Sequence, residues 1–357
     1  LGSGNRVNIG INKSIWQEAY NFSYYDPYFT KDGVSRGYSL FFRETDYGEF
    51  NIANFLTNSF GGGVQFGYPI NEIERVGLNL NYEKTEIDEG SLPAREIKDF
   101  LTSEGNIFET LKAQIVWSRI TLNRGLFPTN GSSIDIFLQS TIPGSDINYY
   151  KVNLRNKFYR PLGFADLVFG FTGELGFLES YGDTKETPFF ENFYSGGPRS
   201  IRGFESNTLG PRVTPAPCYQ YNDITDTCPN IIDTDFDGIP DAPAQNPYLY
   251  AQLDDPIGGN LLIEGSLQMI FKLPMVEDTR SIRSAFFLDF GNVFSTNCKD
   301  YQFNCFEPSV DELRYSIGVG ITWMTGFGPM SFSLSQPFND GIFDRTEEFQ
   351  FTIGTTF

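Results

Sequence analysis

The stretch RYSIGVGITW, residues 314–323, alternates at every position between an apolar residue and a small or polar one. Its apolar members are Tyr315, Ile317, Val319, Ile321 and Trp323, and arginine, serine, glycine and threonine stand between them. Because successive side chains of a β-strand point to opposite faces, this pattern is typical of a strand with one apolar and one polar face. The stretch therefore predicts a strand that separates an apolar environment from a wet one.

The same alternation recurs along the whole chain and predicts an all-β, antiparallel fold with almost no helix. We expect fourteen strands, near residues 4–13, 17–27, 34–46, 57–68, 74–86, 109–121, 131–141, 148–160, 164–178, 259–272, 282–293, 312–324, 328–337 and 347–357.

Alternation alone fits a water-soluble sandwich as well as a membrane barrel, and the polar face favours the barrel. That face carries Gly, Ser, Thr, Asn and Gln with scattered charges such as Glu174, Glu264 and Asp289. Aromatic residues make up 16% of the chain, and no run of eighteen apolar residues offers a membrane-spanning helix. Barrel strands need only about 9–11 residues each. We therefore expect residues 1–357 to form one transmembrane β-barrel domain of the outer-membrane type, apolar outside and wet inside.

The connections between the predicted strands alternate in length. Short turns such as Phe29–Gly33 and Pro69–Ile73 alternate with longer loops, the longest being 179–258. Bacterial barrels have tight periplasmic turns and long external loops, so an even strand count places both ends of the chain in the periplasm. The loop at 87–108 contains a short helix candidate, Leu92–Thr102, which Ser91 would cap and which would shield the barrel rim.

The charge balance and the residue types exclude several classes of function. A net charge of −19 disfavours a nucleic-acid partner, whose phosphates it would repel. The chain has no histidine, so a Ser–His dyad is impossible, and no glycine-rich phosphate loop opens a helix. We therefore expect no enzyme activity and no required cofactor.

The four cysteines form two close pairs, Cys218 with Cys228 and Cys298 with Cys305, each inside a polar, turn-rich segment. Paired loop cysteines predict disulfides and an oxidising compartment. The alternative is a zinc site, which would want tighter spacing or histidine partners.

A possible calcium site lies within the segment 179–258. Asp233, Asp235, Asp237 and Asp241 alternate around a glycine turn, and the Ile239 carbonyl would add a further oxygen ligand. Ala244 stands where a calcium loop usually has its bidentate glutamate. The sequence therefore predicts either a structural Ca²⁺ site that stiffens the loop or a solvated acidic turn.

Several ordered blocks carry a resemblance to a known family. They are Asn123–Gly131, Thr141–Ser145, Ile201-Arg202-Gly203-Phe204, Phe287–Gly291, Gly328–Phe338 and Phe349–Gly354. This set resembles the barrel domain of the BamA family, the outer-membrane protein assembly factors, whose sixth external loop carries a Val/Ile-Arg-Gly-Phe tetrad. The resemblance implies a sixteen-strand barrel and aligns this chain from the family's third strand, so that the periplasmic POTRA domains and two strands would precede it.

The resemblance also implies positions for the site residues. The tetrad Ile201–Phe204 would fold back into the lumen, and Arg202 would pair there with Asp289, unless it simply lies in an external turn. Where the family has a second luminal acid this chain has Gln268, with Glu264 one luminal step away, which leaves the second partner of Arg202 open.

The function implied by the resemblance is that of an outer-membrane insertase. Client strands would enter at a lateral seam beside the C-terminal strand, whose apolar and terminal members are Phe349, Phe351, Ile353, Gly354 and Phe357. Its partners would be outer-membrane lipids, unfolded barrel clients and accessory lipoproteins bound through the missing periplasmic domains. We expect the exposed edge at Gln350–Phe357 to be bent inward, disordered or paired with another chain. The alternatives are a TamA-like or two-partner secretion pore and a passive channel.

Overall fold

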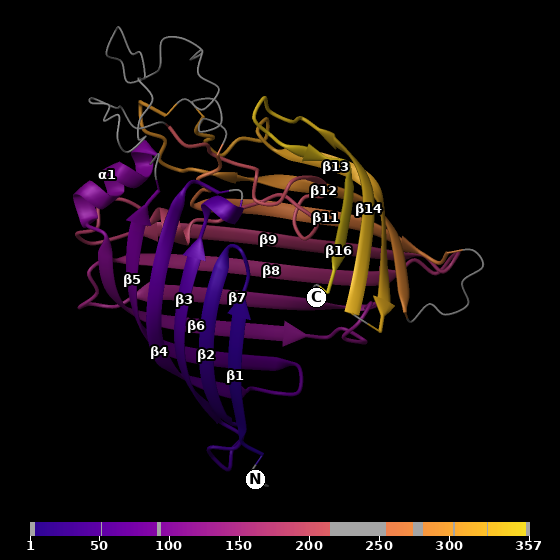
Figure 1. Cartoon of the computed structure of the whole chain (residues 1–357). Helices are drawn as coiled ribbons and strands as arrows, with labels where there is room; N and C mark the ends of the chain where they lie inside the picture. The colour runs from indigo at the N-terminus through magenta and orange to yellow at the C-terminus, as the bar shows by residue number, and fades with distance from the viewer. Residues whose placement is uncertain are drawn as a thin grey trace.

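The computed structural model describes residues 4–50, 52–90, 94–214, 255–273, 281–302, 304–326 and 328–354. Its main feature is one antiparallel sheet of 14 strands that follow each other in chain order from β1 to β16. The sheet curves into a wall around an interior space, the lumen, with β1 and β16 at its two edges (Figure 1). The predicted fold class and strand count are confirmed, although β1 and β16 do not pair and the sheet is not closed.

The strands of the sheet and the other regular elements agree with most of the predicted segments. The main strands are β1 Arg6–Lys13, β2 Gln17–Asp26, β3 Ser35–Asp46, β4 Phe55–Pro69, β5 Glu74–Glu89, β6 Ile107–Ile120, β7 Gly131–Thr141, β8 Tyr149–Pro161, β9 Val168–Ser180, β11 Leu261–Phe271, β12 Ile282–Phe294, β13 Arg314–Thr325, β14 Gly328–Phe338 and β16 Phe349–Ile353. The short elements are η1 Gly48–Phe50, α1 Arg95–Glu104, η2 Phe189–Glu191, and the paired strands β10 Gly203–Phe204 and β15 Thr346–Glu347.

The outer face of the wall is apolar, as the alternation predicts. Leu40, Phe286 and Leu334 expose 63%, 57% and 58% of their surface, whereas inward-facing Asp289 and Ser316 are fully buried. An outward apolar skin over a polar interior is the inverse of a soluble core and matches a lipid-facing wall. None of the described helices is long and apolar enough to cross a membrane.

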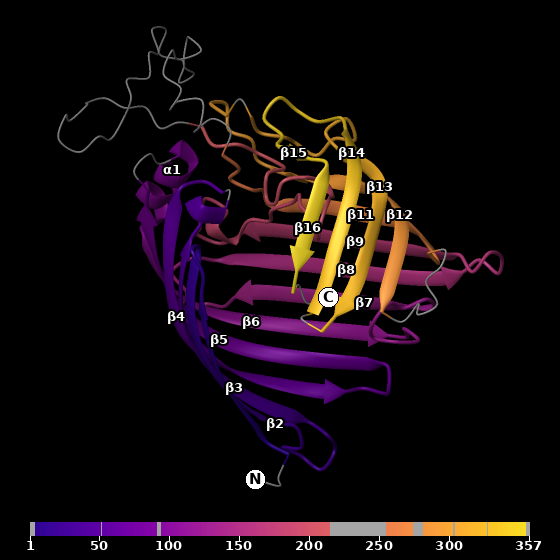
Figure 2. The ribbon, with the colours of Figure 1, turned by 45° about the vertical axis from the view of Figure 1, so that its right-hand side comes forward.

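The connections separate the sheet into two ends. The turns after β4, β8 and β13 are short, while the connections after β5, β9 and β12 gather at the opposite end with α1 (Figures 1 and 2). We call these the turn end and the loop end. The connection between β9 and β11 is the long loop, and part of it enters the lumen, where β10 pairs with β15.

Helix α1 begins later than predicted, at Arg95 instead of Leu92, and its cap residue Ala94 makes no side-chain capping bond. The reason is tertiary: the Arg95 N–H donates to the Thr214 carbonyl of the long loop at 2.7 Å, which satisfies one of the free donors of the first turn. Ser91, the expected cap, lies outside the described residues.

The start of the final strand, predicted at residue 347, also differs from the prediction. Thr346 and Glu347 pair with the long loop as β15, and of the described residues Phe349–Ile353 pair with β14. Between them, the Ser335 N–H donates to the Glu348 carbonyl at 2.8 Å, which continues the β14–β16 register by one residue. The end of the sheet is therefore shared between the wall and the loop.

The largest apolar cluster lies at the loop end and not inside the wall. Phe100 of α1 packs against Phe108 at the start of β6 and against Phe189 of η2, with ring centroids 5.8 and 5.4 Å apart. All three rings are buried. The long loop and α1 are thus fixed to the rim by ordinary hydrophobic packing.

Candidate functional site

The predicted tetrad Ile201–Phe204, which we call the tip, lies in the lumen against the last strands of the sheet. Arg202 forms a two-pronged ion pair with Asp289 of β12, Nε to Oδ2 and Nη2 to Oδ1 both at 2.7 Å. The Arg202 backbone N–H also donates to Asp289 Oδ2 at 3.1 Å. The Asp289 side chain is fully buried and that of Arg202 is 16% exposed, so the pair is well shielded from water.

The Arg202 guanidinium makes two further contacts. Nη2 donates to Ser266 Oγ of β11 at 3.0 Å, and the group lies over the Phe287 ring at 3.3 Å from its centroid. Gln268 contacts Ser266 at 3.3 Å and therefore stands one step from the arginine. The second partner that the sequence left open is thus a serine.

Glu264 holds a different part of the long loop. It accepts hydrogen bonds from the hydroxyls of Ser195, at 3.0 Å, and Ser200, both just before the tip. Gln268 and Glu264, the two residues considered as further partners of Arg202, make no direct hydrogen bond to it in the described structure, but both line the same cavity. The lumen beside the tip holds a cavity of about 400 Å³ that Arg202, Glu264 and Gln268 line.

Gly203 and Phe204 continue the contact towards the C-terminal strands. Gly203 has φ +93°, and an added Cβ would stand 3.1 Å from Ser335 Oγ and 3.3 Å from Ser316 Cβ. Only glycine fits this left-handed backbone pressed against the wall. Phe204 is fully buried. The tip therefore touches five neighbouring strands, from β11 to β16.

Gln350 of β16 is a site residue that the sequence analysis did not single out. Its side-chain carbonyl accepts from the Gly203 N–H at 3.4 Å, and its Nε2 donates to the Phe204 carbonyl at 2.6 Å. It is 2% exposed. Its only sequence signal is that it faces inward between Phe349 and Phe351, which is a position shared with many polar residues of the wall.

A second anchor of the long loop, also missed from sequence, is Glu191 at the end of η2. It accepts from Lys112 Nζ at 3.0 Å and from the Tyr149 hydroxyl at 2.7 Å, and Lys151 donates to its backbone carbonyl at 2.6 Å. Burial alone would raise the pKa of Glu191, but the charges of Lys112 and Lys151 hold that pKa well below its ordinary value.

A third anchor binds the exit of the tip to the connection before β16. Arg212 is 1% exposed and contacts Asp344 Oδ1 at 3.1 Å, while Arg314 Nε of β13 contacts Asp344 Oδ2 at 2.5 Å. One buried carboxylate thus bridges two arginines, one from the long loop and one from β13.

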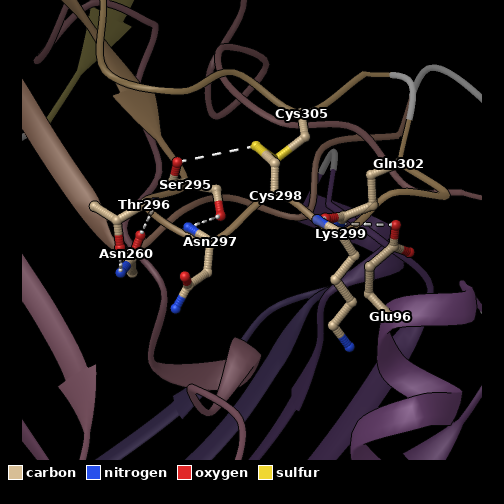
Figure 3. The surroundings of a disulfide bond; sticks show 9 residues. All are labelled: Glu96, Asn260, Ser295, Thr296, Asn297, Cys298, Lys299, Gln302 and Cys305. Carbon is tan, nitrogen blue, oxygen red and sulfur yellow. Dashed lines mark hydrogen bonds between the residues drawn. A yellow bond between two sulfur atoms is a disulfide. The ribbon is translucent and has the colours of Figure 1, made fainter.

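The predicted disulfide between Cys298 and Cys305 is present in the connection after β12, with Cα atoms 5.7 Å apart (Figure 3). We call residues 298–305 the disulfide loop. Gln302 donates to Glu96 of α1 at 3.1 Å (Figure 3), and the Tyr301 hydroxyl donates to Asp99 at 2.9 Å. Burial raises the pKa of Glu96. The disulfide loop therefore binds α1 at the loop end.

Other predicted residues fall outside the described structure. They are Cys218, Cys228, the proposed calcium ligands Asp233, Asp235, Asp237, Ile239 and Asp241, and the terminal Phe357. Within the described ranges, no group of three or more Asp, Glu, Cys or His side chains could hold a metal ion. The calcium site stays a prediction, which calorimetric titration of Ca²⁺ into the protein and its Asp235→Asn, Asp237→Asn variant would test.

Three of the predicted seam residues, Phe349, Phe351 and Ile353, lie on the outer face of the last strand. Phe349, Phe351 and Ile353 are 59%, 44% and 57% exposed, and the Gly354 N–H donates to the Pro329 carbonyl at 2.8 Å. Among the described strands β16 has β14 as its only neighbour in the sheet. Its other edge carries no strand there, so its backbone groups on that side can accept a partner.

Comparison with known proteins places this geometry in context. The Omp85 superfamily domain matches residues 1–357. The outer membrane protein assembly factor BamA of Neisseria meningitidis is 29% identical over 388 residues, which cover 100% of this chain and 44% of that protein. BamA of Nitratidesulfovibrio vulgaris is 24% identical over 336 residues, 92% of this chain and 36% of that protein. The chain therefore spans less than half the length of these relatives.

A solved structure gives the same picture. The crystal structure of BamA from Haemophilus ducreyi lacking POTRA domains 1–3 superposes with a TM-score of 0.81 at 27% identity, over 100% of this chain and 65% of that one. At this level of similarity the fold of the wall is shared.

Proposed function

Because the chain belongs to the Omp85 superfamily, we propose that it is the barrel of an outer-membrane insertase, which folds other β-barrel proteins into the bacterial outer membrane. The relatives named above are called outer membrane protein assembly factors. The proposed partners are membrane lipid and unfolded barrel clients. Accessory lipoproteins would bind periplasmic domains outside this chain. The loop end would face the cell exterior and the turn end the periplasm.

The observation that carries the proposal is the one-sided pairing of β16. It pairs with β14 over five residues, from Phe349 to Ile353, and no described strand covers its other edge. Unpaired backbone N–H and C=O groups are costly in lipid, so such an edge binds an incoming strand. A client strand added by β-augmentation would cross the lipid with its backbone groups partly satisfied. This step needs no covalent chemistry, nucleotide or cofactor.

The occupied lumen argues against the passive channel. The tip is bound across β11 to β16, and buried ion pairs at Asp289, Glu191 and Asp344 hold the long loop in place. A steady open pore would require this loop to leave. If the protein is a channel, planar bilayers will show a large steady conductance that Arg202→Ala leaves unchanged; an insertase with a bound tip gives no such steady pore.

The direct test is depletion of the full-length protein from its own cells, followed by quantification of the other outer-membrane barrels. The proposal predicts that nearly all of them fall in abundance while lipoproteins and inner-membrane proteins do not. A loss confined to one secreted substrate would indicate a translocation pore. Unchanged barrel levels would contradict the insertase.

A further inference from the structure

The tip and the C-terminal strand share a contact that the established ion pair does not include. Gln350 of β16 uses both ends of its amide on the tip backbone, accepting from the Gly203 N–H and donating to the Phe204 carbonyl. The side chain lies between the sheet and the tip and is 2% exposed. Because a buried amide without partners is costly, this contact favours strand and tip together over either alone.

The strand that carries Gln350 is otherwise weakly held. Among the described residues it has one neighbouring strand, pairs with that strand over five residues, and exposes Phe349, Phe351 and Ile353 on its outer face. The segment just before it, Thr346–Glu347, pairs with the tip and not with β14. The tip therefore contacts this edge at two places, the β15 segment and the Gln350 side chain.

The tip itself is fixed from the opposite direction. Arg202 is bound by Asp289 of β12 and Ser266 of β11, two strands that have neighbours on both sides. Through the tip, the edge strand β16 is therefore connected to β11 and β12. Only the amide of Gln350 reaches the tip backbone from β16 in the described structure.

We propose that Gln350 is a positioning residue that couples the tip of the long loop to the C-terminal strand, so that release of the tip loosens the strand edge. Coupling of this kind is reciprocal: whatever loosens the strand also loosens the tip. Its consequence for client entry rests on the proposed function, because the edge that is loosened is the edge at which a client would pair.

The test measures hydrogen exchange of backbone amides in the full-length protein in lipid nanodiscs. Gln350→Ala removes both hydrogen bonds to the tip and also the bond from Gln350 Nε2 to Glu347 Oε2 at 3.2 Å. We expect the slow amides of Phe349–Ile353 and of Ile201–Phe204 to exchange faster, each on the order of tenfold for the loss of two buried hydrogen bonds. Gln350→Glu keeps the side-chain length but lacks the donor for the Phe204 carbonyl and adds a charge near Glu347, so it should loosen both segments as well.

The matched control is Thr352→Val. Thr352 lies on the same strand, faces the same side, and makes no side-chain hydrogen bond to any described residue. It should change exchange at the tip less than about twofold, which is below the effect of one hydrogen bond. Faster exchange at Phe349–Ile353 in Gln350→Ala with unchanged exchange at Ile201–Phe204 would overturn the coupling, as would equal effects of the control.

A second measurement keeps the proposal testable if Gln350→Ala does not assemble. Asp289→Asn loosens the tip without touching β16, and the coupling predicts faster exchange at Phe349–Ile353 in this variant too. No change there would overturn it. In vitro insertion of a small client barrel distinguishes failure of the coupling from failure of the proposed function. If exchange at the two segments is coupled but the protein inserts no client, the proposed function is contradicted and the coupling stands. If the protein inserts the client normally but exchange is uncoupled, the coupling is contradicted and the proposed function stands.

Discussion

At the scale of single residues, the ion pair of Arg202 and Asp289 determines where the tip lies. A buried ion pair is not stabilising relative to apolar side chains of the same shape, because both charges lose their hydration. Breaking it is nevertheless costly, because the remaining charge stays buried without a partner. The pair therefore specifies the position of the tip, because the charge of Arg202 is neutralised where Asp289 lies.

The first prediction concerns Asp289→Asn, which keeps the shape of the side chain but removes its charge. Because Arg202 would be left buried without a counter-charge, we expect the free energy of unfolding to fall by about 3–5 kcal/mol. Denaturant titration of the protein in detergent micelles measures it.

The control for Asp289→Asn is Asp166→Asn, at the turn end. Its partner is Lys272 at 2.7 Å, and the two side chains are 68% and 54% exposed, so the loss should be about 0–1 kcal/mol. Equal decreases in the free energy of unfolding for the two variants would show that the luminal ion pair contributes no more to stability than an exposed one.

The sequence predicted the pairing of Arg202 with Asp289 but missed other residues that hold the tip or the long loop, among them Glu191, Ser266 and Gln350. Asp289 stood out because it is a carboxylate in the middle of an apolar strand. Ser266 and Gln350 did not, because uncharged polar residues occur at many positions of the inner face. Their roles depend on which strand passes beside the tip, and that depends on contacts far apart in the chain.

At the scale of the elements, the strands were predictable because their alternation directly reflects lipid outside and water inside. Their ends and the helix start were not. Arg95 starts α1 because the Thr214 carbonyl, more than a hundred residues away, accepts its N–H. In the same way β15 leaves the sheet because the tip, a distant segment, pairs with it.

The second prediction concerns the anchor of η2. An acid whose folded pKa lies below its unfolded value contributes stability that is present above the unfolded value and lost as the pH falls through the folded one. For Glu191 the ordinary value is 4.5 and the folded pKa is lowered. Glu191→Gln should therefore destabilise the protein by about 3–5 kcal/mol near neutral pH, and this difference from the wild type should shrink as the pH falls below 4.5.

The comparison for this pH dependence is Glu109→Gln. Glu109 pairs with Lys84 on the surface, where the side chains are 49% and 35% exposed, so its removal should have a small effect. Unfolding free energies of the three proteins, measured at several pH values, give the result. A difference between wild type and Glu191→Gln that stays constant down to strongly acid pH would contradict the assignment.

The third prediction concerns the disulfide loop. In the double variant Cys298→Ser, Cys305→Ser, the unfolded chain gains conformational freedom. We therefore expect the free energy of unfolding to fall by about 2–4 kcal/mol. Because Tyr301 and Gln302 bind α1, the amides of Arg95–Glu104 should exchange faster. Val310→Ala, in the same connection and 74% exposed, should leave them unchanged. Unchanged α1 protection in the double variant would show that the disulfide loop does not hold the helix.

At the scale of the whole molecule, the chain is a wall of 14 strands with an apolar outer face and a bound loop inside. Its strongest packing lies at the loop end and along the tip, while the edge at β16 has one strand neighbour in the described structure. Stability is therefore unevenly distributed: the long loop and the middle strands are firmly held, whereas β1 and β16 each have one neighbour among the described strands and are the edges that can pair with another strand. The proposed insertase function requires such an edge, because a client strand would pair there.

The most direct test of this account places a photo-crosslinking amino acid at Phe351 of β16 and, separately, at Leu288 of β12 in the full-length protein. Both side chains face outward, 44% and 38% exposed, but β12 has strand neighbours on both sides and β16 on one. With a client barrel arrested during insertion, the account predicts crosslinks to the client from position 351 and none from position 288. Equal crosslinking from both positions, or insertion with no crosslink at position 351, would contradict it.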